Sequence, residues 1–389
     1  PKRNGQQNSK KKSSLNPEVL IAAARKRQED KKVGQTIVTD PIRFDALPLR
    51  NELKQTIQHK GFEKTTPIQH LAIPAALEGK NIQGLAQTGT GKTAAFLIPI
   101  VQQLLENRNG QALILAPTRE LAVQIQQEFK SLTKGMKLFS GCFIGGTNLN
   151  KDIDVLRRKQ HVIIGTPGRL IDLMKRRVLD IRNIETLVLD EFDRMLDMGF
   201  QRDMDYIRNG MHARKQTMLF SATNDKSLEQ QVRLYLENPI KVHASTDGDL
   251  AAGTIEQHFV EPEMDKGKLN QLRDMLDNEE FERVIIFTET KRQVSALCKK
   301  LQQKGIQADD IHGDKTQNAR QRSIRDFSSG KVRVLVATDV AARGLDVDNV
   351  THVINYRVPS TVDSYIHRIG RTGRAGKKGV AITMLDPAQ

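Results

Sequence analysis

Short runs of aliphatic and β-branched residues recur along most of the chain, and stretches with helical periodicity separate them. Four runs precede residue 243, at 112–116, 162–165, 187–190 and 218–221. Four more follow residue 254, at 284–288, 332–338, 352–355 and 380–384. Continuous apolar strands that alternate with helices indicate parallel sheets covered by helices on both faces. The interruption at 243–254 is rich in small and polar residues, which suits a flexible linker.

This pattern predicts an α/β protein of two tandem domains with mainly parallel sheets. We place the first domain at 41–243, the linker at 244–253 and the second domain at 254–389. Residues 1–40 form a basic extension, and residues 1–12 hold five cations and no acid, so we expect disorder there. Pro17 opens a stretch at 17–31 that predicts a marginal helix.

Charge and composition narrow the choice of partners. Lysine and arginine number 61 against 46 aspartates and glutamates, a surplus of 15 that favours a polyanion partner over a merely well-solvated basic surface. Aromatic residues make up only 4% of the chain and tryptophan is absent, so stacking on bases should not dominate recognition. Cys142 and Cys298 have no Cys or His neighbours at metal spacing, so we expect buried thiols in a reducing compartment.

The start of the chain bears on localisation. Its longest apolar run, at 19–24, is too short for a signal peptide or a membrane span. We therefore expect a cytoplasmic protein, or a nuclear one in a eukaryote, without membrane attachment.

The segment AQTGTGKT at 86–93 lies between a strand and a helical stretch that runs from Lys92 to about Leu105. It matches the phosphate-loop pattern G-x-x-x-x-G-K-[ST], except that Ala86 stands at the first glycine position. Such glycines let backbone N–H groups surround phosphate oxygens, the lysine reaches the β- and γ-phosphates, and the last hydroxyl binds Mg²⁺. The alternative is a chance glycine-rich turn, which leaves the flanking strand and helix unexplained.

A second polar segment, LVLDEFD at 187–193, ends an apolar run. Asp190 can hold Mg²⁺ through water, and Glu191 can polarise an attacking water. Alone, this pair could be a solvated strand end. In a chain that also carries Lys92, it predicts a site for Mg²⁺ and a nucleoside triphosphate.

The third segment, IHRIGRTGR at 366–374, places arginines at 368, 371 and 374. It could be a basic RNA-binding loop. We favour arginine fingers that the second domain supplies to the γ-phosphate. Hydrolysis would then require the two domains to close.

Further segments occur in a fixed order around these motifs: FEKTTPIQ at 62–69, PTREL at 117–121, Gly145-Gly146, TPGRL at 166–170, SAT at 221–223, FTET at 287–290, QNAR at 317–320 and ATDVAARGLD at 337–346. Over about residues 41–386, the chain resembles a DEAD-box ATP-dependent RNA helicase of superfamily 2, which has two RecA-like domains. Within the family the resemblance is closest to compact bacterial RhlE-type helicases.

The resemblance implies a role for each matching residue. Phe44 would stack on adenine, Gln69 would read its edge, and Asp346 would meet the ribose. The implied ATP-binding set is Phe44, Gln69, Gln87, Thr88, Gly89, Thr90, Gly91, Lys92, Thr93, Gly344 and Asp346. Thr93 and Asp190 would hold Mg²⁺. The implied catalytic set is Lys92, Asp190, Glu191, Arg371 and Arg374.

The remaining motifs would bind RNA or couple the two ligands. The implied RNA contacts, to phosphates and sugars, are Pro117, Thr118, Arg119, Gly145, Gly146, Thr166, Arg169, Arg320 and Thr338. Gln317 and His367 would link Asp193 and the Ser221–Thr223 motif across the cleft. The resemblance implies a monomer that unwinds RNA locally or remodels ribonucleoproteins. An ATP-gated RNA clamp and a superfamily 2 DNA translocase are the alternatives.

One departure concerns the name of the family itself. Phe192 stands where the family has alanine, while Asp190, Glu191 and Asp193 are kept. A phenylalanine in an alanine-sized space would cost about 1–3 kcal/mol by overpacking. We expect smaller neighbours to have made room for it and the chemistry to be intact.

Overall fold

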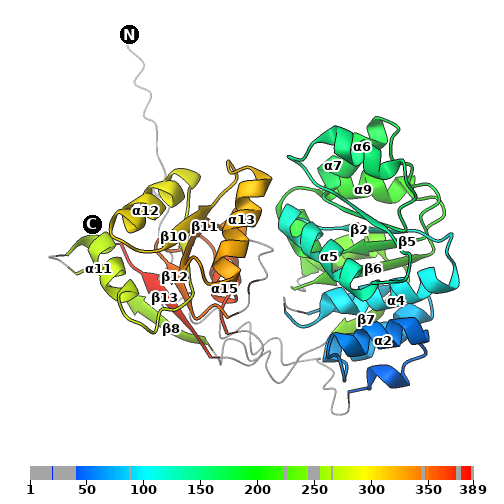
Figure 1. Ribbon diagram of the computed structural model, residues 1–389, viewed down its shortest axis with the longest axis horizontal. Coiled ribbons are helices and arrows are strands. Elements are labelled where there is room, and N and C mark those ends of the chain that lie inside the picture. Colours follow the sequence, from blue (N-terminus) through cyan, green and yellow to red (C-terminus); the bar gives the residue numbers. More distant parts are fainter. Residues whose placement is uncertain are drawn as a thin grey trace, which may run out of the picture.

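The computed structural model describes residues 20, 41–86, 89–222, 226–243, 255–263, 266–342, 347, 349–373 and 378–386. These residues form two α/β domains that lie side by side, each with one parallel sheet between two layers of helices (Figure 1). The predicted fold class and the predicted division into two domains are both present. The linker at 244–253 and the proposed disorder at 1–12 lie outside the described residues.

The first domain is built on a seven-stranded parallel sheet in the order β3-β4-β2-β5-β6-β1-β7. Its strands are β1 (Ile82–Leu85), β2 (Ala112–Leu115), β3 (Ser140–Phe143), β4 (Val162–Gly165), β5 (Thr186–Leu189), β6 (Gln216–Ser221) and β7 (Ile240–His243). Its helices are η1 (Phe44–Ala46), α2 (Asn51–His59), α3 (Pro67–Leu77), α4 (Lys92–Glu106), α5 (Arg119–Leu132), α6 (Leu149–Leu156), α7 (Pro167–Lys175), α8 (Phe192–Asp197), α9 (Gln201–Gly210) and α10 (Lys226–Tyr235).

The second domain has a six-stranded parallel sheet in the order β10-β11-β9-β12-β13-β8. Its strands are β8 (Ile255–Val260), β9 (Val284–Thr288), β10 (Ala308–Ile311), β11 (Val334–Thr338), β12 (His352–Asn355) and β13 (Gly379–Met384). Its helices are α11 (Gly267–Leu276), α12 (Lys291–Gln303), α13 (Gln317–Ser328), α14 (Asp339–Ala342) and α15 (Val362–Ile369).

Alternate residues of the central strands enter different cores, because successive side chains of a strand point to opposite faces. In β2, Ala112 and Ile114 pack with α3, α4 and α5, whereas Leu113 and Leu115 pack with α7, α9 and α10. The strands of the second sheet divide in the same way. Burial on both faces explains why these strands read as continuous apolar runs.

One residue of the N-terminal extension is described. Leu20 is helical, fully buried, and packs with Ile255, Tyr365 and Ile369 of the second domain. A helical conformation at Leu20 agrees with the helix predicted at 17–31, whose other residues lie outside the described range. This extension therefore contacts the domain that is farther from it in sequence.

Candidate active site

Three neighbouring strands of the first sheet end at the predicted catalytic segments. β5, β6 and β1 are adjacent, and the register places Leu85 beside Ser221. The backbone N–H of Ala86 continues this pairing by donating to the Ser221 carbonyl at 3.0 Å. The phosphate-loop segment, the Asp190–Glu191 pair and Ser221 therefore lie at one edge of one sheet, as the sequence predicted.

The loop that leads into α4 has the backbone of a phosphate cradle. Gly89 and Gly91 have φ angles of 82° and 90°, in the left-handed region that favours glycine. A Cβ at Gly91 would overlap the Gln69 amide, and the left-handed backbone would strain any residue with a side chain, so this position favours glycine. Lys92 is buried, and its Nζ donates to the Ala86 carbonyl at 2.9 Å across the mouth of the loop. Gln87 and Thr88 lie outside the described residues.

The FEKTTPIQ segment holds this loop in place. Thr66 caps α3 in a capping box with Gln69, and the Thr66 hydroxyl donates to the Thr90 carbonyl at 2.8 Å. The Gln69 side chain accepts from the Thr66 N–H at 2.9 Å and donates to the Gly91 carbonyl at 3.1 Å. Gln69 thus supports the cradle directly, and recognition of an adenine edge by this side chain stays a prediction. Phe44 is buried, with its ring tilted against Phe62, so its stacking on adenine stays a prediction too.

The acidic segment at the end of β5 is deeply buried. Burial raises the pKa of the Asp190 carboxyl to about 6, against the opposing effect of the positive charge of Lys92. Glu191 adopts a left-handed backbone, with φ of 53°, and caps α8. Its Oε2 accepts from the Arg194 guanidinium at 2.6 Å, and both side chains are at most 5% exposed. The two buried carboxylates therefore have different environments: Glu191 is ion-paired to Arg194, and Asp190 is not.

Asp193 reaches the next strand. Its Oδ2 accepts from the backbone N–H of Ala222 at 3.1 Å, within the Ser221–Thr223 motif. Thr223 itself lies outside the described residues. The structure therefore brings the acidic segment into direct contact with the motif at the end of β6. The resemblance implied a link between the two through Gln317 and His367 of the second domain, and the link through His367 stays a prediction.

The other half of the same sheet edge carries the PTREL, glycine-pair and TPGRL segments, because β2, β3 and β4 are neighbours. The Arg119 guanidinium lies against the backbone of Gly145 and Gly146, where a Cβ on Gly146 would overlap it. Arg169 forms a buried ion pair with Asp152 and donates to the Thr147 carbonyl at 2.9 Å. Pro117, Thr118 and Thr166 are buried at the starts of α5 and α7. These residues are therefore gathered at one place, and their contact with a ligand stays a prediction.

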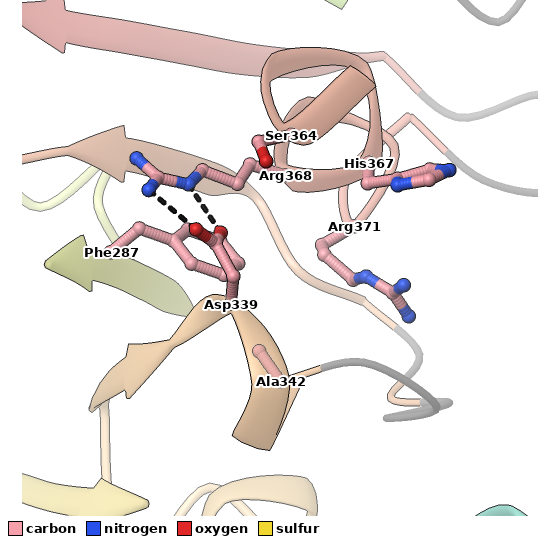
Figure 2. Close-up of a pocket in the computed structure, with 7 residues that line it drawn as sticks. All are labelled: Phe287, Asp339, Ala342, Ser364, His367, Arg368 and Arg371. Carbon is pink, nitrogen blue, oxygen red and sulfur yellow. Dashed lines mark hydrogen bonds and ion pairs between the residues drawn. The ribbon is translucent and has the colours of Figure 1, made fainter. Parts of the chain in front are cut away.

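In the second domain, α15 and the turn after it present the arginine segment. Arg368 is 2% exposed and its guanidinium pairs with both carboxylate oxygens of Asp339, at 2.5 and 2.8 Å. Figure 2 shows that His367 and Arg371 extend away from this pair. Arg368 therefore links α15 to α14. Of the two predicted arginine fingers, Arg371 is the one that the structure describes. Arg374, Gly344 and Asp346 lie outside the described residues.

One contact crosses from the second domain to the first. Gln317 Nε2 donates to Glu120 Oε1 at 3.1 Å, and Arg320 Nη2 lies 2.9 Å from Glu120 Oε2. All three residues are at most 8% exposed. The resemblance implied that Gln317 would meet Asp193 or the Ser221–Thr223 motif; in the structure it instead meets Glu120 of the PTREL segment. Thr338 ends β11 in the same domain and is partly buried.

Two family models match the two domains of the structure. Residues 66–231 match the DEAD/DEAH box helicase model, and residues 267–376 match the helicase conserved C-terminal domain. The chain belongs to the DEAD/DEAH box helicase family. The ATP-dependent RNA helicase CshA of Listeria monocytogenes is 44% identical over 350 residues, which cover 89% of this DEAD-box chain and 66% of that protein. The chain thus spans just under two thirds of the length of that relative. A particular closeness to RhlE-type helicases stays a prediction.

Solved structures share the arrangement of both domains. Saccharomyces cerevisiae Dbp5 bound to RNA and ADP BeF3 has a TM-score of 0.79 and 33% identity, over 89% of this chain and 90% of that one. Mss116p bound to single-stranded RNA and AMP-PNP also has a TM-score of 0.79, at 30% identity, over 91% and 76% of the two chains. The prediction of two RecA-like helicase domains is confirmed.

Three site residues of this DEAD-box chain were not predicted from the sequence. Arg194 holds Glu191, Glu120 joins the two domains, and Asp152 neutralises Arg169. The spacing of Arg194, three residues after Glu191 at a helix start, was a usable signal. Glu120 and Asp152 carried none, because their partners are distant in sequence.

Phe192 lies in the core on the α10 side of the first sheet. It is fully buried, and its ring meets the edge of Tyr235 at a centroid distance of 5.1 Å and an angle of 70°. The Tyr235 hydroxyl in turn donates to Asp205 at 2.8 Å. Because α10 follows the Ser221–Thr223 motif, this contact ties the acidic segment to the helix beyond that motif. The ring is fully buried beside Tyr235, itself a large side chain, so the expectation of smaller neighbours stays a prediction.

We predict that Phe192→Ala lowers the free energy of unfolding by about 3–5 kcal/mol, since it removes a fully buried ring and leaves a cavity. Urea denaturation of the full chain, followed by circular dichroism, measures this. Phe139→Ala is the control, because Phe139 is 56% exposed and should matter by less than about 0.5 kcal/mol. A faster ATPase without loss of stability would contradict the prediction and show that the ring obstructs the site.

None of the helices in the described part of the chain combines the length and the apolar character needed to span a bilayer.

Proposed function

We propose that this chain is an ATP-dependent RNA helicase, in which RNA-stimulated ATP hydrolysis drives local, sequence-independent duplex unwinding or ribonucleoprotein remodelling. The observation that carries the proposal is the composite site: Lys92, Asp190 and Glu191 lie on one domain, and Arg371 lies on the other. The names of the relatives, which include ATP-dependent RNA helicases and chains bound to RNA and nucleotide, support it.

The residues present fit a nucleoside triphosphate with Mg²⁺. A Cβ at Gly89 would meet nothing within 4 Å, so space is open on that side of the loop, and α4 directs its N-terminus to it. Lys92 can exchange the Ala86 carbonyl for phosphate oxygens. Thr93 and Asp190 would hold Mg²⁺, which supplies charge to neutralise the phosphates.

Glu191 is the proposed base. The contact with Arg194 fixes one carboxylate oxygen of Glu191 and so orients the other. That second oxygen can accept a proton from the water that attacks the γ-phosphate. Arg371 would approach the same phosphate when the domains close, and stabilise the charge that develops there.

We propose that RNA lies over the β2, β3 and β4 half of the edge, next to Arg119 and the glycine pair, and reaches Arg320 and Thr338 of the second domain. Contacts to phosphates position a strand without reading its sequence, and contacts to 2′-hydroxyls favour RNA over DNA. ATP and RNA would both stabilise the closed arrangement, so each should raise the affinity for the other by the same factor.

A strand-displacement assay with parallel measurement of ATP turnover tests the function. We expect a short RNA duplex to be separated and ATP hydrolysis to depend on RNA. Retention of RNA with ATP but without displacement would identify a clamp instead. Equal stimulation by DNA would indicate a DNA translocase.

Ionisation of Asp190 makes a prediction about pH. Mg²⁺ requires the carboxylate, and the pKa of about 6 means that protonation competes as the pH falls through that value. We expect the affinity for MgATP to decrease below pH 6, by up to about tenfold per pH unit. Titration with a fluorescent ATP analogue measures this affinity. Asp190→Asn is the control: the variant should bind MgATP more weakly, and its affinity should not depend on the ionisation of residue 190. An identical pH profile in the two proteins would contradict the assignment.

Glu120 should control the closed state. Its removal leaves Arg320 buried without a counter-charge, which typically costs 3–5 kcal/mol. We expect Glu120→Ala to weaken RNA binding in the presence of a non-hydrolysable ATP analogue by at least about tenfold. Fluorescence anisotropy measures the affinity. Glu128→Ala is the matched control, because Glu128 lies on the same helix but pairs with Lys60 of its own domain. Equal effects of the two variants would show that the interdomain contact is irrelevant.

A further inference from the structure

A basic surface lies at the end of the first domain opposite the proposed ATP and RNA site. The loops that precede β2, β3 and β4 meet there, because the amino-terminal ends of parallel neighbours share one edge. We call this surface the amino-edge patch and define it by Arg108, Lys137, Phe139, Arg158 and Lys159, all of which are exposed.

Side chains of the patch tie its three loops together. Arg108 donates to the Met136 carbonyl at 2.5 Å, and Lys159 donates to the Arg108 carbonyl at 2.9 Å and to Asn109 Oδ1 at 3.1 Å. Gln111 adds a bond to the Gln160 carbonyl at 2.8 Å. The loops are therefore held in a fixed arrangement, and the cations occupy defined positions.

The positive charge of the patch is not neutralised by acids. The partners of Arg108 and Lys159 are neutral carbonyl and amide oxygens, and within the described ranges no carboxylate forms an ion pair with any of the four cations. The neighbouring His161 is affected by the same positive charges: burial lowers its pKa, and the charges of Lys159 and Arg108 lower it further. The patch therefore presents uncompensated cations to the solvent.

An aromatic ring stands among these cations. Phe139 is 56% exposed, and its ring lies 5.8 Å from that of His161. Its backbone is fixed by two bonds to the same residue: the Phe139 N–H donates to His161 Nδ1 at 3.1 Å, and the His161 N–H donates to the Phe139 carbonyl at 2.8 Å. A single exposed apolar residue is ordinary on a protein surface. An exposed aromatic ring on a fixed backbone, in a patch that also carries cations, is instead typical of surfaces that bind single-stranded nucleic acid.

We propose that the amino-edge patch is a second RNA-binding surface, with phosphates on its cations and a base stacked on Phe139. The inference rests on the proposed helicase function and extends it to RNA segments that lie outside the cleft. RNA is favoured over an acidic protein because a base offers a ring face to Phe139 as well as phosphates to the cations. An RNA already bound in the cleft would also present its flanking nucleotides to the patch at a high effective concentration.

The test compares two RNAs and two charge-reversal variants of the full chain. The patch variant is Lys137→Glu/Arg158→Glu/Lys159→Glu, which keeps the bond from Arg108 to the Met136 carbonyl but removes the two bonds that Lys159 donates to residues 108 and 109. The control is Lys299→Glu/Lys300→Glu/Lys304→Glu, three exposed lysines near the C-terminal end of α12 and at its C-cap, with the same total charge change. Affinity is measured by anisotropy for a short oligoribonucleotide that fills only the cleft and for a long single strand.

We expect the patch variant to bind the long RNA about tenfold more weakly, and its log–log salt slope to fall by about 2, since each phosphate contact on a single strand contributes about 0.7. Phe139→Ala should weaken the long RNA by at least about fivefold without changing the salt slope. Affinity for the short RNA, and ATP hydrolysis stimulated by it, should stay as in the unmodified chain. Thermal unfolding of both variants measures whether loss of the Lys159 bonds disturbs the fold.

Two results would overturn the proposal. Equal losses in the patch and control variants would show that only net charge matters. No loss in the patch variant would show that the surface does not bind RNA and would favour an acidic protein as its partner. Failure of the helicase function appears separately, as the absence of ATP hydrolysis with the short RNA.

Discussion

Replacement of Arg371 by lysine is expected to lower RNA-stimulated ATP hydrolysis by about 10³-fold or more, the effect that arginine fingers have in other nucleotide hydrolases. Arg371 follows α15 in the second domain, and Arg368 in the same segment is already committed to Asp339. Lysine keeps the charge but lacks the planar fork that contacts two phosphate oxygens. Arg371 should therefore act only when the domains are closed.

Steady-state ATPase rates at saturating RNA measure this effect. ATP binding without RNA should be unchanged, because the first domain supplies the phosphate cradle. Arg292→Lys, an exposed arginine on α12, is the control for loss of a guanidinium in the same domain. A variant at Arg371 that hydrolyses ATP at nearly the normal rate would refute the composite site.

Lys92→Ala should abolish ATP turnover and Glu191→Gln should slow it strongly, for different reasons. Lys92 lies inside the phosphate loop, so its loss should remove both ATP binding and hydrolysis. Glu191→Gln should retain ATP binding while hydrolysis slows by about 10²–10⁴, the usual contribution of a general base. Single-turnover hydrolysis and titration with a fluorescent ATP analogue separate the two effects.

A stability control belongs with this pair, because Glu191 also balances the buried charge of Arg194. Glutamine can still accept a hydrogen bond from Arg194 but carries no charge, so some loss of stability is expected. Thermal unfolding with bound ATP analogue shows whether the variant is folded during the assay. Normal RNA-stimulated hydrolysis by Glu191→Gln would eliminate this residue as the base.

The sequence predicted the interior of each sheet and missed its margins. The interior strand β1 was expected only as the strand before the phosphate loop and not as an apolar run. The strands that were not predicted at all are β3, β7, β8 and β10, the four edge strands of the two sheets. Edge strands keep polar residues, as in the IEQHFV of β8 and the ADDI of β10, because one side is open to water. A search for continuous apolar runs therefore finds only strands that are buried on both faces.

The candidate site divides in a similar way. Lys92, Asp190 and Asp193 could be assigned because the loop, the strand and the spacing that position them are local in sequence. The partners that set their environment are not local: Gln69 meets Gly91, and Glu120 meets Gln317 and Arg320 almost 200 residues away. Such pairings arise from the packing of whole domains, which periodicity along the chain does not record.

The burial of Leu20 in the second domain bears on where this protein can be divided. A truncation at residue 41 respects the first domain but uncovers the apolar site formed by Ile255, Tyr365 and Ile369. Tyr365 and Ile369 belong to α15, the helix that carries His367 and Arg368. Shortened proteins made for crystallisation or kinetics would then expose an apolar surface on the helix that carries the arginine segment. A protein that keeps Leu20 would, by contrast, keep this apolar site covered.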